Sequence, residues 1–128
     1  MIGGTDVIFE TGLQQAQSLE IAVRTVARIW PRAVFQDALT GEILDSIDLI
    51  PFTRMKELLC YRDAAACQQW DALGADAATE NTMIHLLAYD AGRLTVVVDN
   101  VARGDAAIFL SAISEAFAGG TKPLKHTA

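Results

Sequence analysis

The feature that most constrains the fold is a pair of β-rich runs within residues 82–99, TMIHLLAYDAGRLTVVVD, joined by a short turn. Gly92 in that turn can adopt the positive φ that a tight hairpin turn needs. The second run contains three consecutive valines, which is typical of a central, well-buried strand. Because strands joined by a tight turn run antiparallel, this hairpin predicts an antiparallel sheet.

Three more strands are predicted ahead of this hairpin, at 33–38, 43–50 and 57–62. Gly41 marks a turn between the first two, and Pro51 ends the second. The alternation in 43–50 is imperfect because Asp45 and Asp48 interrupt the aliphatic residues. A bulged or one-sided edge strand tolerates such interruptions, so we expect 43–50 at an edge of the sheet.

Apolar residues at three- and four-residue steps predict helices over 11–30, 64–73 and 105–118. Thr11, Asp63 and Asp105 are the expected N-caps, and Pro31 stops the first helix. Ile21 is exceptional, since it falls among the polar residues of the first helix. Such a side chain is either an ordinary exposed residue or a contact for a partner.

The element order is therefore α-β-β-β-α-β-β-α, which predicts an α+β fold with a mainly antiparallel five-stranded sheet and three helices. Because the strands form adjacent hairpins, we expect helices over one face of the sheet. We expect one domain over 1–118 and a flexible tail over 119–128, where no periodicity is visible.

The charge is strongly acidic and unevenly distributed. The 128 residues carry a net charge of −6, but the only residues charged after Glu115 are Lys122 and Lys125, so the body carries −8. An acidic surface disfavours nucleic acid and anionic membranes and steers basic partners toward it. The N-terminal residues lack the pattern of a secretion signal, and no run of about 18 apolar residues occurs, so we predict a cytoplasmic protein with free thiols.

Motifs for chemistry are sparse. Glycine-rich phosphate-binding patterns do not occur. Cys60 and Cys67 do not have a zinc-ligand spacing, and we expect both to be packed core thiols. The aspartates and glutamates fit cap, turn and surface roles. The sequence thus predicts no catalytic residue, no metal site and no cofactor, and it favours a non-enzymatic function.

One alternative is a small enzyme or a ligand-binding domain. Its pocket would lie between the sheet and the helices, near His85, with Tyr61 and Tyr89 as neighbours. His85 alternates with Ile84 and Leu86, so it occupies one face of a strand. A histidine near tyrosines can act in proton transfer, but the sequence does not establish that these residues meet.

The leading hypothesis is a protein-binding module, with a homodimer as one form of association. We expect two recognition surfaces: the polar face of the first helix around Ile21 and Arg28, and an acidic edge near Asp45 and Asp48. Complementary charge would steer the partner, and an apolar side chain would supply affinity.

Over about residues 11–118 the chain resembles class I type III secretion chaperones in length, acidity and element order. That resemblance implies a homodimer that holds an extended segment of a secreted effector. The chain departs from the family pattern in having residues 6–10, DVIFE, before the first helix. It also resembles small bacterial immunity proteins, which are acidic α/β domains that neutralise a toxin. Both resemblances imply a protein that works by binding another protein.

Overall fold

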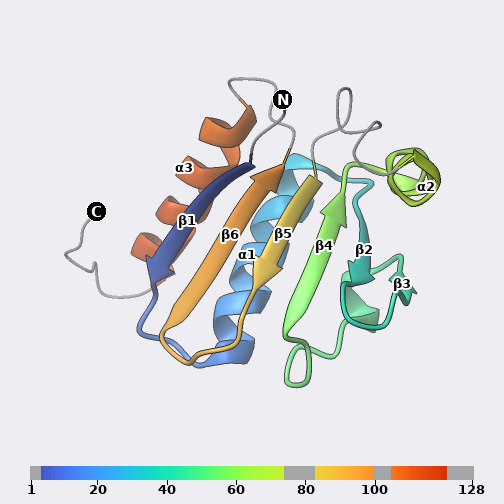
Figure 1. Cartoon of the computed structure of the whole chain (residues 1–128). Coiled ribbons are helices and arrows are strands. Elements are labelled where there is room, and N and C mark those ends of the chain that lie inside the picture. The colour runs from blue at the N-terminus through green and yellow to red at the C-terminus, as the bar shows by residue number, and fades with distance from the viewer. Residues whose placement is uncertain (1–3, 74–82, 100–104, 121–128) are drawn as a thin grey trace.

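A computed structural model describes residues 4–73, 83–99 and 105–120 (Figure 1). The elements, in chain order, are β1 (Gly4–Glu10), α1 (Gln15–Ile29), β2 (Val34–Asp37), β3 (Ile43–Leu44), the 3-10 turn η1 (Ile47–Leu49), β4 (Glu57–Tyr61), α2 (Ala64–Leu73), β5 (Met83–Leu87), β6 (Arg93–Asp99) and α3 (Asp105–Gly120).

The six strands form one sheet in the order β1-β6-β5-β4-β2-β3, and every pair is antiparallel. The predicted α+β class, three helices and antiparallel sheet are therefore confirmed, but the strand count of five is wrong. The additional strand is β1, at the edge beside β6. The predicted hairpin is confirmed as β5 and β6, and Gly92 has φ 83°.

Residues 43–50 were predicted to form one strand, but most of them do not pair with the sheet. Only Ile43 and Leu44 pair with β2, and the chain then turns into η1. The Ser46 hydroxyl accepts a hydrogen bond from the Asp48 N–H at 3.2 Å, which favours the turn over continued pairing. Asp45 therefore follows a strand, and Asp48 lies within the 3-10 turn.

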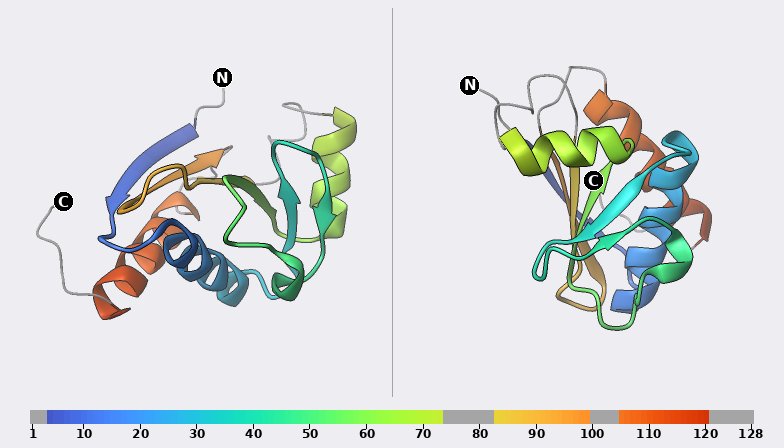
Figure 2. Two further views of the ribbon diagram at one scale, coloured as in Figure 1. Left: turned by 90° about the horizontal axis from the view of Figure 1, so that it is seen from below. Right: turned by 90° about the vertical axis from the view of Figure 1, so that its right-hand side faces the viewer.

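The sheet has a large hydrophobic core on one face and a small one on the other. Seen edge-on, α1 and α3 lie on one side and α2 lies on the other (Figure 2). On the α1–α3 side, alternate strand residues build the main core: Phe35, Leu58, Cys60, Ile84, Leu86, Leu94, Val96 and Val98 are all 2% exposed or less. Two aromatic contacts involve α3. Trp30 at the end of α1 packs against Phe109, with ring centroids 4.6 Å apart, and Phe9 of β1 packs against Phe117, with centroids 5.8 Å apart.

A second, smaller core lies under α2 on the opposite face. There Ala66 and Cys67 of α2 pack with residues of three strands, namely Val34, Tyr61 and Met83. The bounds of α2 agree with the prediction, and Asp63 caps the helix as expected by accepting the Ala66 N–H at 2.8 Å. Because α2 is short, it packs only near one end of the sheet, beside β2 (Figure 1) and against the end of β4.

The first helix buries more than its periodicity indicated. It begins at Gln15, and the predicted cap Thr11 lies before it, with its buried hydroxyl 2.7 Å from that of Ser18. Ser18 and Thr25, two polar residues of this helix, are also buried. The segment after η1 reaches this flank of α1, because the Gln15 side chain donates to the Met55 carbonyl at 3.0 Å.

The C-terminal end differs slightly from the prediction. Helix α3 continues to Gly120, two residues beyond the expected end. The rest of the expected tail, 121–128, lies outside the described residues. In the parts of the chain that the structure describes, no helix is long and apolar enough to span a membrane.

Candidate functional site

The face of the sheet opposite α1 and α3 carries a hydrogen-bonded group of three side chains, which we call the Glu57 cluster: Glu57, His85 and Tyr89. Glu57 Oε1 lies 3.0 Å from His85 Nε2. The Tyr89 hydroxyl donates to Glu57 Oε2. Both oxygens of the Glu57 carboxylate therefore have a partner, and both partners come from β5 or the residues just after it.

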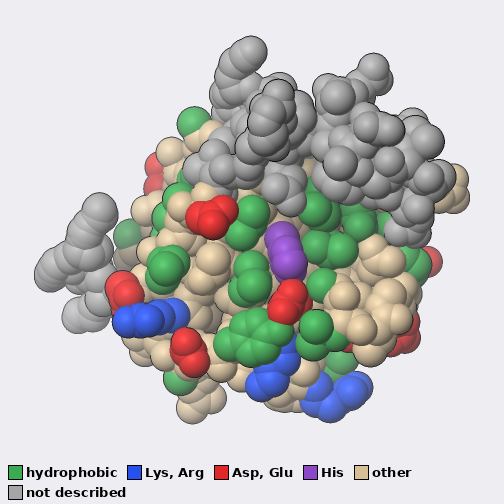
Figure 3. All heavy atoms as spheres, in the orientation of Figure 1, with side chains coloured by type: hydrophobic (Ala, Val, Ile, Leu, Met, Phe, Trp, Pro, Cys, Tyr) green, Lys and Arg blue, Asp and Glu red, His purple; other side chains and the backbone are tan. Residues whose placement is uncertain are grey.

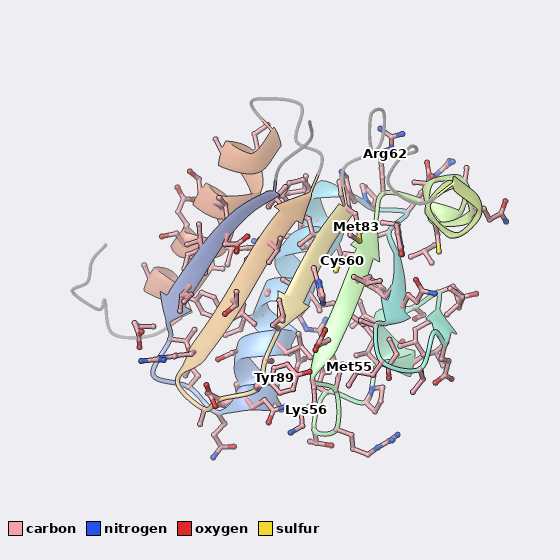
Figure 4. All side chains as sticks on the ribbon, viewed as in Figure 1. Met55, Lys56, Cys60, Arg62, Met83 and Tyr89 are labelled. Atoms are coloured by element: carbon pink, nitrogen blue, oxygen red, sulfur yellow. The ribbon has the colours of Figure 1, made fainter. Side chains whose placement is uncertain are left out.

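Strand register produces this arrangement. Glu57 lies opposite Leu87, and His85 lies opposite Leu59, so Glu57 and His85 are diagonal neighbours on the same face of β4 and β5. Tyr89 follows β5 and returns toward the start of β4. Figure 4 shows Tyr89 at the end of β5 opposite to Met83. Figure 3 looks onto this face, where hydrophobic side chains are spread across the strands.

The Glu57 carboxylate is the shared hydrogen-bonding partner in this cluster. An ionised carboxylate only accepts hydrogen bonds, so a bond to that form requires a proton on His85 Nε2. Acceptance by Glu57 stabilises the neutral phenol and raises the pKa of Tyr89 above its usual value of 10.0. The cluster can hold an imidazole in one orientation, as a proton-transferring or ligand-contacting histidine requires.

The alternative pocket predicted from the sequence is thus brought together only in part. His85 and Tyr89 meet through Glu57, which no pattern in the sequence marked as their partner. Tyr61 belongs to the smaller core, where its buried hydroxyl donates to Gln36 Oε1 at 2.8 Å. His85 lies on the face opposite α1 and α3, so it is not enclosed between the sheet and those helices.

The two cysteines lie in different layers. Cys60 faces the main core, and Cys67 lies under α2. Both are free and buried. Burial strongly raises the pKa of the Cys60 thiol, so this side chain stays protonated and is not activated as a nucleophile. Among the described residues, no group of three or more histidine, cysteine and acidic side chains could hold a metal ion.

The predicted partner-binding residues have different surroundings. Arg28, Asp45 and Asp48 are exposed. Ile21 is partly buried and packs against the main core, so it is less available as an apolar anchor than its helical position indicated. Periodicity placed it on a polar flank, but that flank is covered by other parts of the fold.

Exposed apolar side chains occur instead around β3. Leu39, Ile43 and Leu49 are between 45% and 62% exposed, and they lie in the same short stretch as Asp45 and Asp48. We call these five residues the β3 surface. From residue 37 to residue 49 the sequence contains four acidic residues and no lysine or arginine. This edge of the molecule is therefore both acidic and apolar.

Comparison with known proteins gives no family: no family model, no curated protein and no solved structure matches this chain.

Proposed function

We propose that this protein is a binding module for another protein, and that the β3 surface is its recognition surface. The observation that carries the proposal is the combination of exposed Leu39, Ile43 and Leu49 with Asp45 and Asp48 at one edge of the sheet. Exposed aliphatic side chains grouped with charge are typical of interaction sites.

The chemistry of the surface indicates the partner. Apolar side chains supply affinity when a partner covers them, and like-signed charges steer a partner of opposite sign. We therefore expect a basic partner segment that also carries aliphatic or aromatic residues. A cytoplasmic role in holding or neutralising such a protein, as a chaperone-like or immunity-like module, agrees with this chemistry.

Selection from a phage-displayed peptide library tests the proposal. Immobilised wild-type protein should enrich peptides that combine lysine or arginine with apolar residues, and their binding should weaken as salt increases. The variant Leu49→Ser/Asp48→Asn should lose this enrichment while remaining folded. The matched control is Ile8→Ser/Asp6→Asn, which likewise changes an exposed aliphatic residue and an exposed aspartate, but at the opposite edge. No enrichment by the wild type, or equal enrichment by the β3 variant, would contradict the proposal.

A second candidate function, a small enzyme or ligand-binding domain, is favoured by the Glu57 cluster. In this alternative His85 contacts the ligand and Glu57 orients the imidazole. An NMR fragment screen that follows the His85 ring tests it. A fragment that shifts this ring should bind more weakly to Glu57→Gln and equally well to Asp90→Asn, which removes a nearby exposed acid. If no fragment perturbs His85, the candidate fails.

A further inference from the structure

Strand β1 forms a long, regular edge of the sheet. Its seven residues pair with β6 one for one, from Gly4 opposite Asp99 to Glu10 opposite Arg93. The strand contains no proline, and the pairing has no bulge. Prolines, bulges, very short strands and exposed charges are the usual devices that keep an edge from pairing with another chain. Of these devices the strand has only the exposed charges of Asp6 and Glu10.

The pairing of β1 with β6 determines which backbone N–H and C=O groups of β1 point away from the sheet. The Thr11 N–H donates to the Gly92 carbonyl at 2.7 Å. Because bonding directions alternate in an antiparallel ladder, Val7 and Phe9 direct their N–H and C=O groups toward β6. Asp6, Ile8 and Glu10 direct theirs outward. The strand therefore presents a row of donors and acceptors that a further strand would satisfy.

The described exposed side chains of β1 are Asp6, Ile8 and Glu10, so one isoleucine lies between two acids. Ile8, in the middle of the outward-bonding row, is 58% exposed. Helix α3 runs along β1 on the α1–α3 side of the sheet (Figures 1 and 2). Among its described exposed residues, the only charged one is Glu115; the others are Ala107, Ile108, Ser111, Ser114 and Ala118. By contrast, the exposed face of α1 carries the Glu20–Arg24 ion pair and Arg28.

We propose that two copies of this chain associate through β1, with the β1 strands antiparallel about a two-fold axis at Val7 and the two sheets joined into one. This dimer is independent of the β3 surface, which lies at the other edge. A second copy supplies an edge strand that can pair with β1 and, beside it, the exposed face of its own α3, where Glu115 is the one described charged residue. A two-fold axis brings these features together in matching order.

Charge selects the register. Pairing centred on Ile8 would place Asp6 opposite Glu10 of the second copy, and this like-charge pair would occur twice. Pairing centred on Val7 places Asp6 opposite Ile8, uses all seven residues of β1, and makes the two exposed isoleucines diagonal neighbours. Glu10 then lies opposite Gly4, and Arg93 of the same chain is already 3.3 Å from its carboxylate.

The first experiment removes one outward N–H. Sedimentation velocity of the wild type should show a dimer that dissociates on dilution. Ile8→Pro should be a folded monomer, because proline is tolerated where the N–H points away from the sheet. Leu39→Ser removes an equally exposed aliphatic residue far from β1 and should remain a dimer. A wild type that is monomeric at all concentrations, or a dimer that survives Ile8→Pro, would overturn the proposal.

The second experiment tests the register. Val7 lies opposite its own copy in a non-hydrogen-bonded pair, where the Cα atoms are about 4.5 Å apart, within the range for a disulfide. Val7→Cys should therefore form a covalent dimer on mild oxidation. Glu10→Cys should not, because the two copies of residue 10 would be about 20 Å apart. The native Cys60 and Cys67 are buried and should not react. Crosslinking through residue 10 but not through residue 7 would refute this register.

Discussion

The two edges of the sheet differ in almost every property that controls association. The β1 edge has seven residues in an unbroken register and one large exposed apolar side chain, Ile8. The β3 edge has two paired residues, after which the chain turns away into η1. Backbone groups dominate what β1 offers a partner, whereas side chains dominate what β3 offers. The same sheet thus presents one edge suited to strand addition and one suited to a surface contact.

The largest expected effect is at the short edge. Leu44 is 4% exposed and belongs to the main core, whereas its neighbour Ile43 is 45% exposed. We expect Leu44→Ala to lower the free energy of unfolding by about 2–5 kcal/mol because it leaves a cavity. Ile43→Ala should change it by less than about 0.5 kcal/mol. Urea unfolding followed by circular dichroism measures both. Similar losses in the two variants would mean that β3 is not held by Leu44.

The next effect separates the two sides of β1. Val7→Pro removes an N–H that bonds to β6 and leaves a carbonyl of β6 without its donor, so we expect a loss of about 1–3 kcal/mol. Ile8→Pro removes an outward N–H and should cost the isolated protomer less. Urea unfolding at protein concentrations below the dissociation constant of the dimer compares the free energies of unfolding of the two variants. A larger loss for Ile8→Pro would show that the even-numbered residues face β6 instead.

These differences explain which features the sequence revealed. The hairpin of β5 and β6 and the helix α2 were predictable because a turn glycine and a cap residue mark their ends. Strand β1 was missed because Ile8 interrupts the alternation of Asp6 and Glu10 with the inward Val7 and Phe9. An edge strand has a neighbouring strand on one side only, so its alternation of apolar and polar residues is less regular.

The site was less predictable than the fold. His85 and Tyr89 were singled out, but their shared partner Glu57 lies 28 residues before His85. The contact depends on the register of β4 against β5, and a shift by one residue would move His85 to the other face. Likewise, Ile21 has an exposed position in a helical projection of α1, and only tertiary packing buries it partly.

A smaller effect lies between the two edges, in the Glu57 cluster. Because the hydrogen bond to Glu57 raises the pKa of Tyr89, the folded state holds this proton more tightly than the unfolded state. The contribution to stability is therefore present below about pH 10 and is lost as the pH rises through the folded-state pKa. Phenolate absorbance of a Tyr61→Phe protein measures the titration. Adding Glu57→Gln should move the midpoint downward; an unchanged midpoint would exclude Glu57 as the cause.

The smallest effect is at the surface of the long edge, and its sign distinguishes folding from association. The Glu10–Arg93 pair is more than half exposed on both sides, so Glu10→Gln should change the free energy of unfolding by less than about 1 kcal/mol. In the proposed dimer, however, Glu10 is a diagonal neighbour of Asp6 in the second copy. Neutralising Glu10 should therefore strengthen self-association by about 0.2–1 kcal/mol, and Arg93→Gln should weaken it by a similar amount. Sedimentation equilibrium at low salt measures both changes. The opposite signs are the decisive observation, because loss of one ion pair would affect folding in the same direction in both variants. If both variants associate as the wild type does, then the charges on β1 do not lie near a second copy.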